Sequence, residues 1–409
     1  MGRTILTNAS LLDGDNPAQP GRAITIDGDR IVAVAADAPA DLTPDDHVVD
    51  VGGRTVMPGM VTCHFHSTYR DLGSTSAPYG LEHPPAYQAL LAADHLRMAL
   101  DAGFTGAVGA GCAHDIDASM ARAIDNGVIP GPRFVPSGHE LSTTGHSNDA
   151  NPWYWDMQGW GVPRVCDGQE EFRAATRDEI KRGVRMIKLY VTGGHGVMAP
   201  KSQTEMTRGE LDAVVDAAHS RGARVRGHIS NKPAILMAVE AGVDVIDHAD
   251  DMDDECIERL AAAGSFVVPS CYFPTAFLEM FSGGGLGFTD AMRADLDRML
   301  EVLPKANAAG VKLVLGDDYG AMGFPHGRYA HELEVYVRDA GIAPLDVLRW
   351  ATVHGADLMG RGHELGRVAD GYLADLLVVD GDPSRDVTVL QDPANLVGIM
   401  KGGAWHKEP

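Results

Sequence analysis

The chain has 409 residues, of which 34 are Lys or Arg and 57 are Asp or Glu, giving a formal net charge of −23. So large an acidic excess argues against a surface for nucleic acid or anionic membrane, because both bind clustered Lys and Arg. The five cysteines are odd in number and form no CxxC pair, which argues against a disulfide framework or a structural zinc site. Since no signal peptide or long apolar run is evident, we expect a reducing, cytoplasmic location.

Both ends of the chain read as β-strands. Residues 23–34 are two strand-like runs around Asp27-Gly28, a strong hairpin signal. Residues 374–380 and 397–405 are strand-like and separated by polar turns. We therefore predict a small β-sandwich domain built from residues 1–57 and 360–409.

The middle of the chain, residues 58–359, alternates short apolar runs with helix-like segments, and several of these segments end in a glycine that would cap a helix. We predict eight strands, at Val61–His66, Phe104–Gly109, Arg133–Gly138, Arg185–Val191, Ala223–His228, Val243–His248, Phe266–Ser270 and Lys312–Asp317. Eightfold alternation of strand and helix is typical of a (β/α)8 TIM-like barrel, so the predicted fold class is α/β.

Polar residues at the carboxyl ends of the predicted strands are the candidate site, because barrel active sites lie there. His64 and His66 share one face of their strand, since side chains alternate along a strand. Titratable or metal-ligating side chains also occur on four other strands, at Lys188, His228, His248 and Asp317. Each histidine alone could be a hydrogen-bonded core residue and Asp317 alone a helix N-cap, but their occurrence together favours a metal centre.

Lys188 is the most informative of these residues. Its neighbours Ile187, Leu189 and Val191 share the opposite face, so Lys188 points into the barrel, where an unpaired ammonium is costly. It could form a salt bridge, act as a catalytic amine, or react with CO2 to give a carbamate that bridges two cations. The surrounding histidines and aspartate favour the carbamate, because burial and a nearby dication both lower the pKa of a lysine.

Taken together, these residues resemble those of the amidohydrolase superfamily of metal-dependent hydrolases. The resemblance covers nearly all of the chain and rests on Met57–His66, Ile187–Leu189, Gly227-His228, Asp247-His248, Gly316-Asp317 and Gly371–Asp380. Leu141–His146 and Thr192–Gly194 resemble the imidazolonepropionase-like and prolidase-like branch, which cleaves amide bonds of dipeptides, N-acyl amino acids or small cyclic amides. One departure is the absence of a tyrosine in residues 202–208, where dipeptidase relatives often have one that holds the substrate carboxylate.

The resemblance implies a binuclear centre with two divalent ions, for which zinc suits the ligands. His64, His66 and Asp317 would hold one ion and His228 and His248 the other, with carboxylated Lys188 as the bridge. His146 would contact the substrate carbonyl. A hydroxide shared by the ions would attack an amide carbon, and Asp317 would pass its proton to the leaving nitrogen.

The substrate is a small molecule that the sequence defines less sharply. Tyr69, Arg70 and His195 follow strand ends and are candidates for binding its polar groups. Trp153, Trp155 and Trp160 could form an aromatic wall or pack their own loop, and a bulky apolar or aromatic amide is favoured. A cyclic amide, aryl urea, carbamate or ester would suit the same centre.

Two other classes of function stay open. A mononuclear deaminase of the same superfamily would use one metal ion, although such relatives usually lack the bridging lysine. A non-catalytic barrel would have lost ligands, and none is missing here. We also expect association into a homo-oligomer, with no nucleic-acid or membrane partner.

Overall fold

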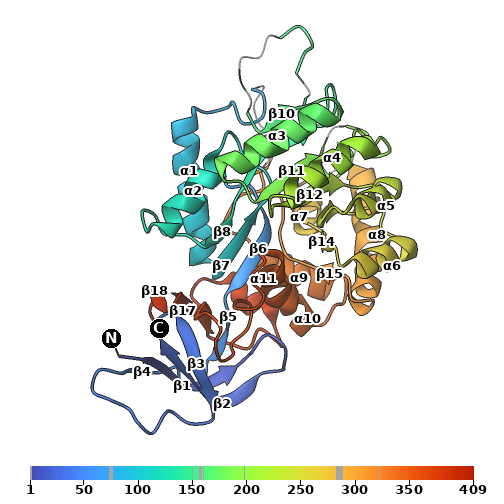
Figure 1. Cartoon of the computed structure of the whole chain (residues 1–409). Helices are drawn as coiled ribbons and strands as arrows, with labels where there is room; N and C mark the ends of the chain where they lie inside the picture. Colours follow the sequence, from blue (N-terminus) through green and yellow to red (C-terminus); the bar gives the residue numbers. More distant parts are fainter. Residues whose placement is uncertain are drawn as a thin grey trace. The chain divides into compact units, whose positions relative to one another are not determined.

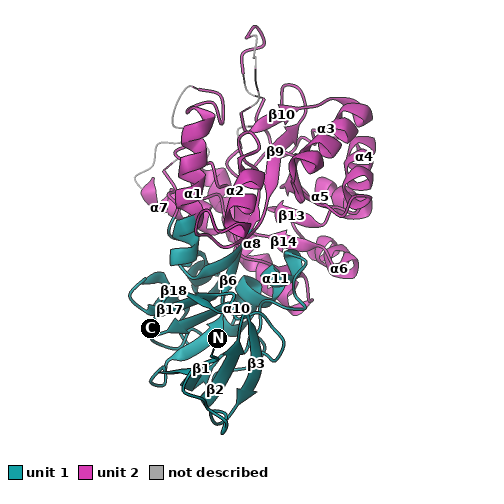
Figure 2. Ribbon diagram, turned by 60° about the vertical axis from the view of Figure 1, so that its left-hand side comes forward, with its two compact units in different colours: residues 1–62, 97–107, 327–409 teal, residues 63–96, 108–326 magenta. Residues whose placement is uncertain are grey.

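The computed structural model describes residues 2–72, 77–149, 151–155, 159, 161–197, 199–281, 289–321 and 323–409. The chain forms two compact units (Figure 2): unit 1 comprises residues 1–62, 97–107 and 327–409, and unit 2 comprises residues 63–96 and 108–326. Figure 1 labels the helices and strands. Among the described residues, no helix is both long enough and apolar enough to cross a membrane. All five cysteines are buried and free, so no disulfide joins them.

Unit 1 is built on one sheet whose strands come from both ends of the chain. Its order is β18-β17-β16-β5-β1-β2-β3, with β4 paired to β1. The antiparallel pairing of β16 with β5 confirms that the two termini share one sheet. The strands are β1 (Thr4–Leu11), β2 (Gln19–Asp27), β3 (Arg30–Ala35), β4 (His47–Asp50), β5 (Thr55–Pro58), β16 (Leu376–Val379), β17 (Leu396–Lys401) and β18 (Ala404–Lys407).

The core of unit 1 is aliphatic and lies against this sheet. Leu6, Ile24, Val56, Val378 and Met400 are buried together there. The predicted hairpin is confirmed, because Asp27 of β2 pairs with Arg30 of β3 and Gly28 adopts φ +59° in the turn. The remaining elements of the unit are α9 (His331–Arg338), α10 (Pro344–Arg349), the π-helix η1 (Trp350–His354), α11 (Gly355–Leu358) and the 3₁₀ helix η2 (Val387–Gln391).

Unit 2 contains a seven-stranded sheet in which every neighbouring pair is parallel, in the order β10-β9-β11-β12-β13-β14-β15. Parallel pairing brings the carboxyl ends of these strands to one edge. The strands are β9 (Ser137–Ser142), β10 (Pro163–Val165), β11 (Met186–Tyr190), β12 (Arg224–Ile229), β13 (Val245–His248), β14 (Phe266–Val268) and β15 (Lys312–Leu313).

Helices follow the strands of unit 2 in the predicted alternation. Thr207 and Glu210 form a capping box at the start of α4, and Gly242 and Gly264 cap α5 and α6 in the left-handed conformation, as their positions predicted. The helices are α2 (Ile116–Asp125), α3 (Gly168–Arg182), α4 (Arg208–His219), α5 (Lys232–Ala241), α6 (Asp254–Ala263), α7 (Tyr272–Met280) and α8 (Thr289–Ala308).

A second, three-stranded sheet joins β6 (Met60–Phe65), β7 (Phe104–Gly109) and β8 (Arg133–Val135), and α1 (Pro85–Asp101) lies between the first two in sequence. Among the described residues from β6 to β15, the assigned strand pairs form these two sheets and no closed ring. Two single backbone hydrogen bonds run between residues of the two sheets or of the segments that directly follow their strands. One runs from Cys63 N to Leu315 O at 2.6 Å, and the other from Cys112 N to Gly138 O at 2.9 Å. The predicted strand–helix alternation is confirmed, whereas closure into a barrel is not.

Two predicted strands differ from those observed. The run at 133–138 is split into β8 and β9 at Pro136, which has no N–H to donate to a ladder. The run at 312–317 pairs only at Lys312 and Leu313. Gly316 then turns the chain at φ +153°, where a Cβ would lie 2.2 Å from the backbone nitrogen of His64. The alternation of side chains predicted for that strand therefore does not reach residue 317.

Candidate metal centre

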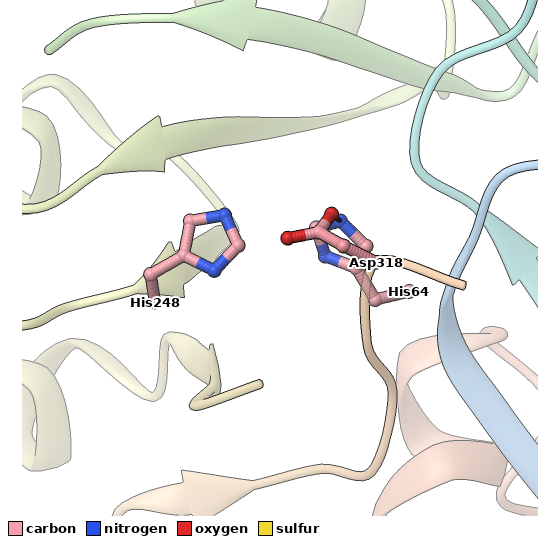
Figure 3. Close-up of side chains that lie close together, drawn as sticks. All are labelled: His64, His248 and Asp318. Atoms are coloured by element: carbon pink, nitrogen blue, oxygen red, sulfur yellow. Dashed lines mark ion pairs between the residues drawn. The ribbon is translucent and has the colours of Figure 1, made fainter. Parts of the chain in front are cut away.

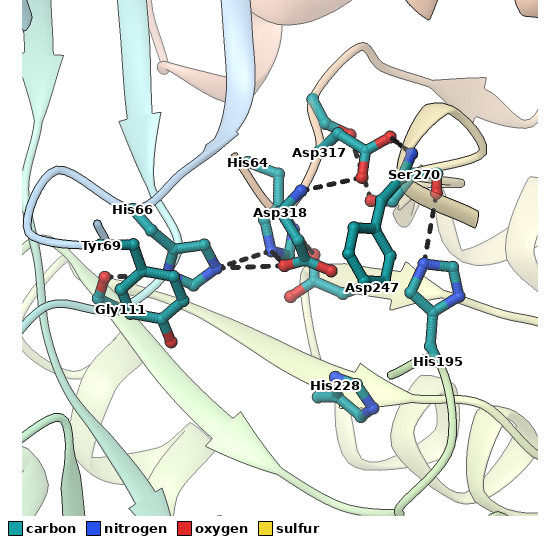
Figure 4. Close-up of polar contacts among 12 residues, drawn as sticks. His64, His66, Tyr69, Gly111, His195, His228, Asp247, Ser270, Asp317 and Asp318 are labelled. Atoms are coloured by element: carbon teal, nitrogen blue, oxygen red, sulfur yellow. Dashed lines mark hydrogen bonds and ion pairs between the residues drawn. The ribbon is translucent and has the colours of Figure 1, made fainter. Parts of the chain in front are cut away.

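The predicted His-x-His pair converges at the end of β6. His64 and His66 are buried, and their Nε2 atoms lie 3.0 Å apart (Figure 4). Nδ1 of His66 lies 3.0 Å from the carbonyl oxygen of Gly111, so its Nε2 is left to face His64. Two ring nitrogens this close need a proton or a cation between them, because two lone pairs repel each other.

Asp318 completes this pair, and Asp317 does not. Oδ1 of Asp318 lies 3.0 Å from Nε2 of His64 and 3.3 Å from Nε2 of His66. Asp317 instead accepts hydrogen bonds from the backbone N–H groups of Tyr272 and Phe273, at 2.8 and 3.0 Å, where α7 begins. The sequence-based choice of Asp317 is thus corrected to the next residue, because the strand pairing ends before this point.

His248 lies beside the same group. His64, His248 and Asp318 each offer a ligand atom, and these atoms all lie within 4.8 Å of one another (Figure 3). Nδ1 of His248 is buried and has no hydrogen-bond partner among the described residues. His248 and Ala249 adopt φ +74° and +57°, an uncommon conformation for residues with a Cβ that is often found at functional sites.

His228 is next to His248, with ring centroids 4.5 Å apart. Its ring stacks on Tyr190 at 4.7 Å, and its Nε2 lies 3.1 Å from the carbonyl oxygen of Gly194. The four histidines predicted as ligands are therefore in one region of unit 2.

Lys188 is buried, but it contacts a carboxylate rather than a histidine. Its Nζ donates to Oδ2 of Asp247 at 2.7 Å. Arg226 contacts the same carboxylate with two nitrogens, at 3.0 and 2.5 Å, and Nδ1 of His64 lies 3.3 Å away. The unmodified side chain thus makes the salt bridge that was one of its three predicted roles.

The protonation of these groups suits a cation. Burial lowers the pKa of His64, lowers that of His248 far below its ordinary range and lowers that of His228 to about 3, so all three are neutral near pH 7. Burial also opposes ionisation of Asp318, but its close contacts with His64 and the hydrogen bonds from His64 and His66 outweigh burial and hold the pKa of Asp318 well below its ordinary value. The cluster therefore presents neutral imidazoles and one carboxylate, donors that a divalent cation binds without displacing protons.

Asp317 has a different electrostatic environment. Burial and the neighbouring charge of Asp318 raise its pKa to about 7. Two adjacent aspartates thus ionise in different pH ranges, and Asp318 is the one that stays charged near neutral pH.

His146 and His195 lie near carboxylates. Nδ1 of His146 is 3.0 Å from Oε1 of Glu205, and its buried Nε2 has no hydrogen-bond partner among the described residues. His195 stacks on His248 at 3.9 Å, and its Nδ1 lies 2.8 Å from Oδ1 of Asp250. Burial would lower the pKa of His195, but Asp250 outweighs burial and raises it to about 9, so His195 is a cation.

The other candidates for substrate contact divide into two groups. Tyr69 stacks on His66 with ring centroids 3.9 Å apart and donates from its hydroxyl to Oε1 of Glu140 at 2.7 Å. Arg70 is exposed and is not a wall residue of the cavities found in the described part of the chain. The same holds for Trp153, which is 93% exposed, and Trp155, which is 45% exposed. Trp160 lies outside the described residues.

A cavity of about 90 Å³ opens on the histidine–aspartate cluster. His195, His228 and Asp318 are in its wall, and the aromatic side chains there are Tyr69, Tyr79, Tyr190 and Phe273. An aromatic lining is thus present, but it comes from tyrosines and a phenylalanine and not from the tryptophans that the sequence suggested.

The sequence analysis missed several polar residues of the site. Asp318 could have been considered because it directly follows Asp317, as a second acid at the same strand end. Arg226, Glu140, Glu205 and Asp250 gave no signal, and Asp247 was noted only as part of the Asp247-His248 motif, because a buried ion pair depends on contacts between distant segments.

Comparison with known proteins decides the family. The model of the amidohydrolase family matches residues 55–405. The chain belongs to the amidohydrolase family. This amidohydrolase is a hydrolase that acts on carbon–nitrogen bonds, and its relatives support amide bonds as the target. The family generally uses divalent metals, which agrees with the donor set of His64, His248 and Asp318.

Its relatives include proteins of the predicted branch. The amidohydrolase is 30% identical over 441 residues to ochratoxinase from Aspergillus niger, covering 99% of this chain and 87% of that protein. It is 24% identical to imidazolonepropionase from Rubrobacter xylanophilus, covering 93% and 90%. A crystal structure of a prolidase in complex with N-methylphosphonate-L-proline superposes with a TM-score of 0.89, at 31% identity over the whole of both chains. Both the family and the branch named from the sequence are confirmed.

Proposed function

We propose that this amidohydrolase hydrolyses an amide bond of a small molecule at a centre of two divalent metal ions, for which zinc suits the ligands. The observation that carries the proposal is the convergence of His64, His66 and Asp318, with His248 beside them. Substrates of the predicted class are N-acyl amino acids, dipeptide-like molecules and aromatic amides. A cyclic amide, aryl urea, carbamate or ester is the alternative at the same centre.

The residues present fit a metal centre. His64, His66 and Asp318 would hold one ion, and His228 and His248 the other, with His248 using a nitrogen that has no described protein partner. Nδ1 of His64 lies 3.0 Å from Nη2 of Arg226, which can only donate, and 3.3 Å from Oδ1 of Asp247. Metal binding at Nε2 would require the ring proton to lie on Nδ1 and face Asp247, the carboxylate–histidine arrangement common at metal sites. A carbamate on Lys188 would be the bridge, and forming it requires Lys188 to leave its ion pair with Asp247.

Bound divalent ions would acidify a water molecule and polarise the amide carbonyl. Asp318, ionised at neutral pH, would accept the proton of the attacking water and return it to the leaving nitrogen. Glu205 holds Nδ1 of His146, so a protonated His146 could donate from its unpartnered Nε2 to the carbonyl oxygen.

We further infer that the seven-stranded and three-stranded sheets belong to one (β/α)8 barrel over residues 58–359, and that residues 1–57 and 360–409 form a β-sandwich domain. The Cys63–Leu315 and Cys112–Gly138 hydrogen bonds support this, since each links the two sheets where a ring of strands would close.

A matched pair of variants, Asp318→Asn and Asp317→Asn, tests the ligand assignment. We expect Asp318→Asn to lose bound metal and to lower kcat/KM on an N-acyl amino acid and dipeptide panel by about 10³-fold or more. Asp317→Asn should keep the metal and lose about 1 kcal/mol of stability, because it weakens the cap of α7. Metal analysis by mass spectrometry on the same batch provides the measurement. The reverse pattern, with metal lost only in Asp317→Asn, would restore the original ligand choice.

The bridge is tested by the mass of Lys188. Native mass spectrometry of the metal-loaded protein should show one added CO2, which is lost on metal removal and absent in Lys188→Arg. Lys188→Ala should lose activity and regain part of it with short carboxylic acids, which replace the missing carboxylate. A fully active, two-metal protein with an unmodified lysine would exclude the carbamate.

One observation favours a second candidate, a mononuclear deaminase. His64, His248 and Asp318 form one compact group, while Lys188 is paired with Asp247. About one metal per chain, together with release of ammonia from amino-substituted heterocycles, would favour deamination. About two metals per chain and cleavage of the amide panel would favour the first proposal.

A further inference from the structure

Unit 2 contains a second, larger cavity next to the candidate centre. Its volume is about 580 Å³, within the roughly 300–1,000 Å³ typical of small-molecule sites. The cavity over the cluster has only about 90 Å³, which is far below that range. An amide group could lie in the smaller cavity, but a larger substituent would need the other space.

The two cavities share part of their walls. His195, Gly196, Val197 and Phe273 belong to both. Gly196 adopts φ +89°, and a Cβ there would lie 3.1 Å from the ring of Phe273, so the absence of a side chain keeps the junction open. Figure 4 shows His195 on the Ser270 side of the cluster, where this junction lies.

The walls of the larger cavity are mostly apolar. They are formed by the loop after β11, by α7 and by one face of α8, with Val197, Phe273, Pro274, Met292, Leu296 and Met299 as the main side chains. Methionine and phenylalanine adapt to aliphatic and aromatic groups alike. The small side chain of Ala294 also lines the cavity and leaves room on α8.

The charged groups of this cavity are already paired. Lys201 lies 3.0 Å from Asp251 and 2.5 Å from Asp295, and Arg298 contacts the same two carboxylates. Asp250 is paired with His195. A charged substituent would have to compete for Lys201 or Arg298 with carboxylates that already hold them at a partly exposed site, so it gains little there.

We propose that the larger cavity binds the uncharged apolar arm of the substrate, an alkyl chain or aromatic ring, while the amide lies in the smaller cavity. The proposal rests on the proposed amide hydrolysis. It makes Ala294 and the junction residues Gly196 and Phe273 determinants of specificity, and it selects hydrophobic N-acyl compounds from the substrate classes named above.

A series of N-acyl glycines tests this on the metal-loaded wild type, with acetyl, butanoyl and hexanoyl chains and an adipoyl chain that ends in a carboxylate. Each fully buried methylene should raise kcat/KM roughly three- to fourfold, so hexanoyl, with four more methylenes, should exceed acetyl by about 80-fold or more. The kcat/KM of the adipoyl compound should be close to that of the acetyl compound. A flat series, or a preference for adipoyl, would overturn the proposal.

The matched variants are Ala294→Trp and Ala308→Trp, the same change at two exposed positions of α8, of which only Ala294 lines the cavity. Ala294→Trp should lower kcat/KM for hexanoyl at least tenfold more than for acetyl, and Ala308→Trp should leave the ratio as in wild type. An equal loss at every chain length in Ala294→Trp would overturn the proposal.

Binding to the Asp318→Asn variant separates this proposal from the proposed reaction. Calorimetry should show tighter binding of the hexanoyl compound than of the acetyl compound, and adding Ala294→Trp should remove the difference. Chain-dependent binding without hydrolysis by wild type would support the cavity and refute amide hydrolysis. Hydrolysis without any chain-dependent binding would refute the cavity alone.

Discussion

Two aspartates of unit 2, Asp247 and Asp318, differ in the groups that balance their negative charge. Asp247 is fully buried, and Arg226 and Lys188 neutralise it. Asp318 faces His64 and His66, whose rings carry no permanent charge, and its side chain is 17% exposed to the cavity. The first carboxylate is balanced by Arg226 and Lys188, whereas the second is held by imidazoles in a group that could bind a metal ion. The contrast distinguishes a structural ion cluster from a ligand site.

Removing the Asp247 carboxylate should have the largest effect on stability. Asp247→Ala leaves Arg226 and Lys188 buried without a counter-charge, and breaking a buried pair in this way costs about 3–5 kcal/mol. Urea denaturation of the metal-free protein measures the loss, with metal-free Asp318→Ala as the control, for which we expect a smaller change. Equal losses in the two variants would remove the distinction drawn between the two carboxylates.

Asp117 is a third buried aspartate, and among the described residues no cation or imidazole forms an ion pair or hydrogen bond with it. Ser67 donates a short hydrogen bond to Oδ1, and the backbone N–H of Ser137 donates to Oδ2 at 3.2 Å. Burial raises the pKa of Asp117 to about 7. Between about pH 4 and pH 7 the folded state therefore keeps a proton that the unfolded state has released.

Folding stability should consequently fall as pH rises through this window, by up to about 4 kcal/mol from this group. Asp117→Asn cannot ionise, so it should not show this loss. The free energy of unfolding of the variant minus that of wild type should therefore increase from pH 4 to pH 7. Urea midpoints of both proteins across this range give the difference. A difference that is constant with pH would mean that Asp117 titrates near its ordinary value.

The smallest effect is expected at Trp153, remote from both kinds of carboxylate. Trp153→Ser should change stability by less than about 0.5 kcal/mol, because the side chain is 93% exposed. It should also leave KM for hydrophobic amides as in wild type, which steady-state kinetics will check. A clear rise in KM would return this loop to the substrate site.

Sequence patterns located the strands of the site well, because buried parallel strands are continuous apolar runs. The pair His64 and His66 was predicted from alternation alone, and β6 is regular enough to preserve it. The same rule failed at Asp317, because β15 pairs for only two residues before Gly316 turns the chain. Side-chain direction can be read from sequence only as far as the ladder extends.

Buried ion pairs are the second feature of the site that the sequence could not predict. Arg226 lies inside a strand that reads as apolar and polar residues in mixed order, and its partner Asp247 is 21 residues away. No local pattern marks such a contact, since its favourable energy depends on the exact approach of two segments. The family resemblance supplied the ligand classes, but it could not distinguish two adjacent acids.

Arg226 makes one further set of contacts. Besides Asp247 on β13, its Nη1 donates to the carbonyl oxygens of Cys63 and Gly109, at 2.7 and 3.0 Å, on strands of the other sheet. One guanidinium therefore cross-links β6, β7, β12 and β13 directly beneath the histidine cluster. Selection for activity at high temperature should therefore leave position 226 unchanged, even where substrate specificity is altered through Ala294 on α8.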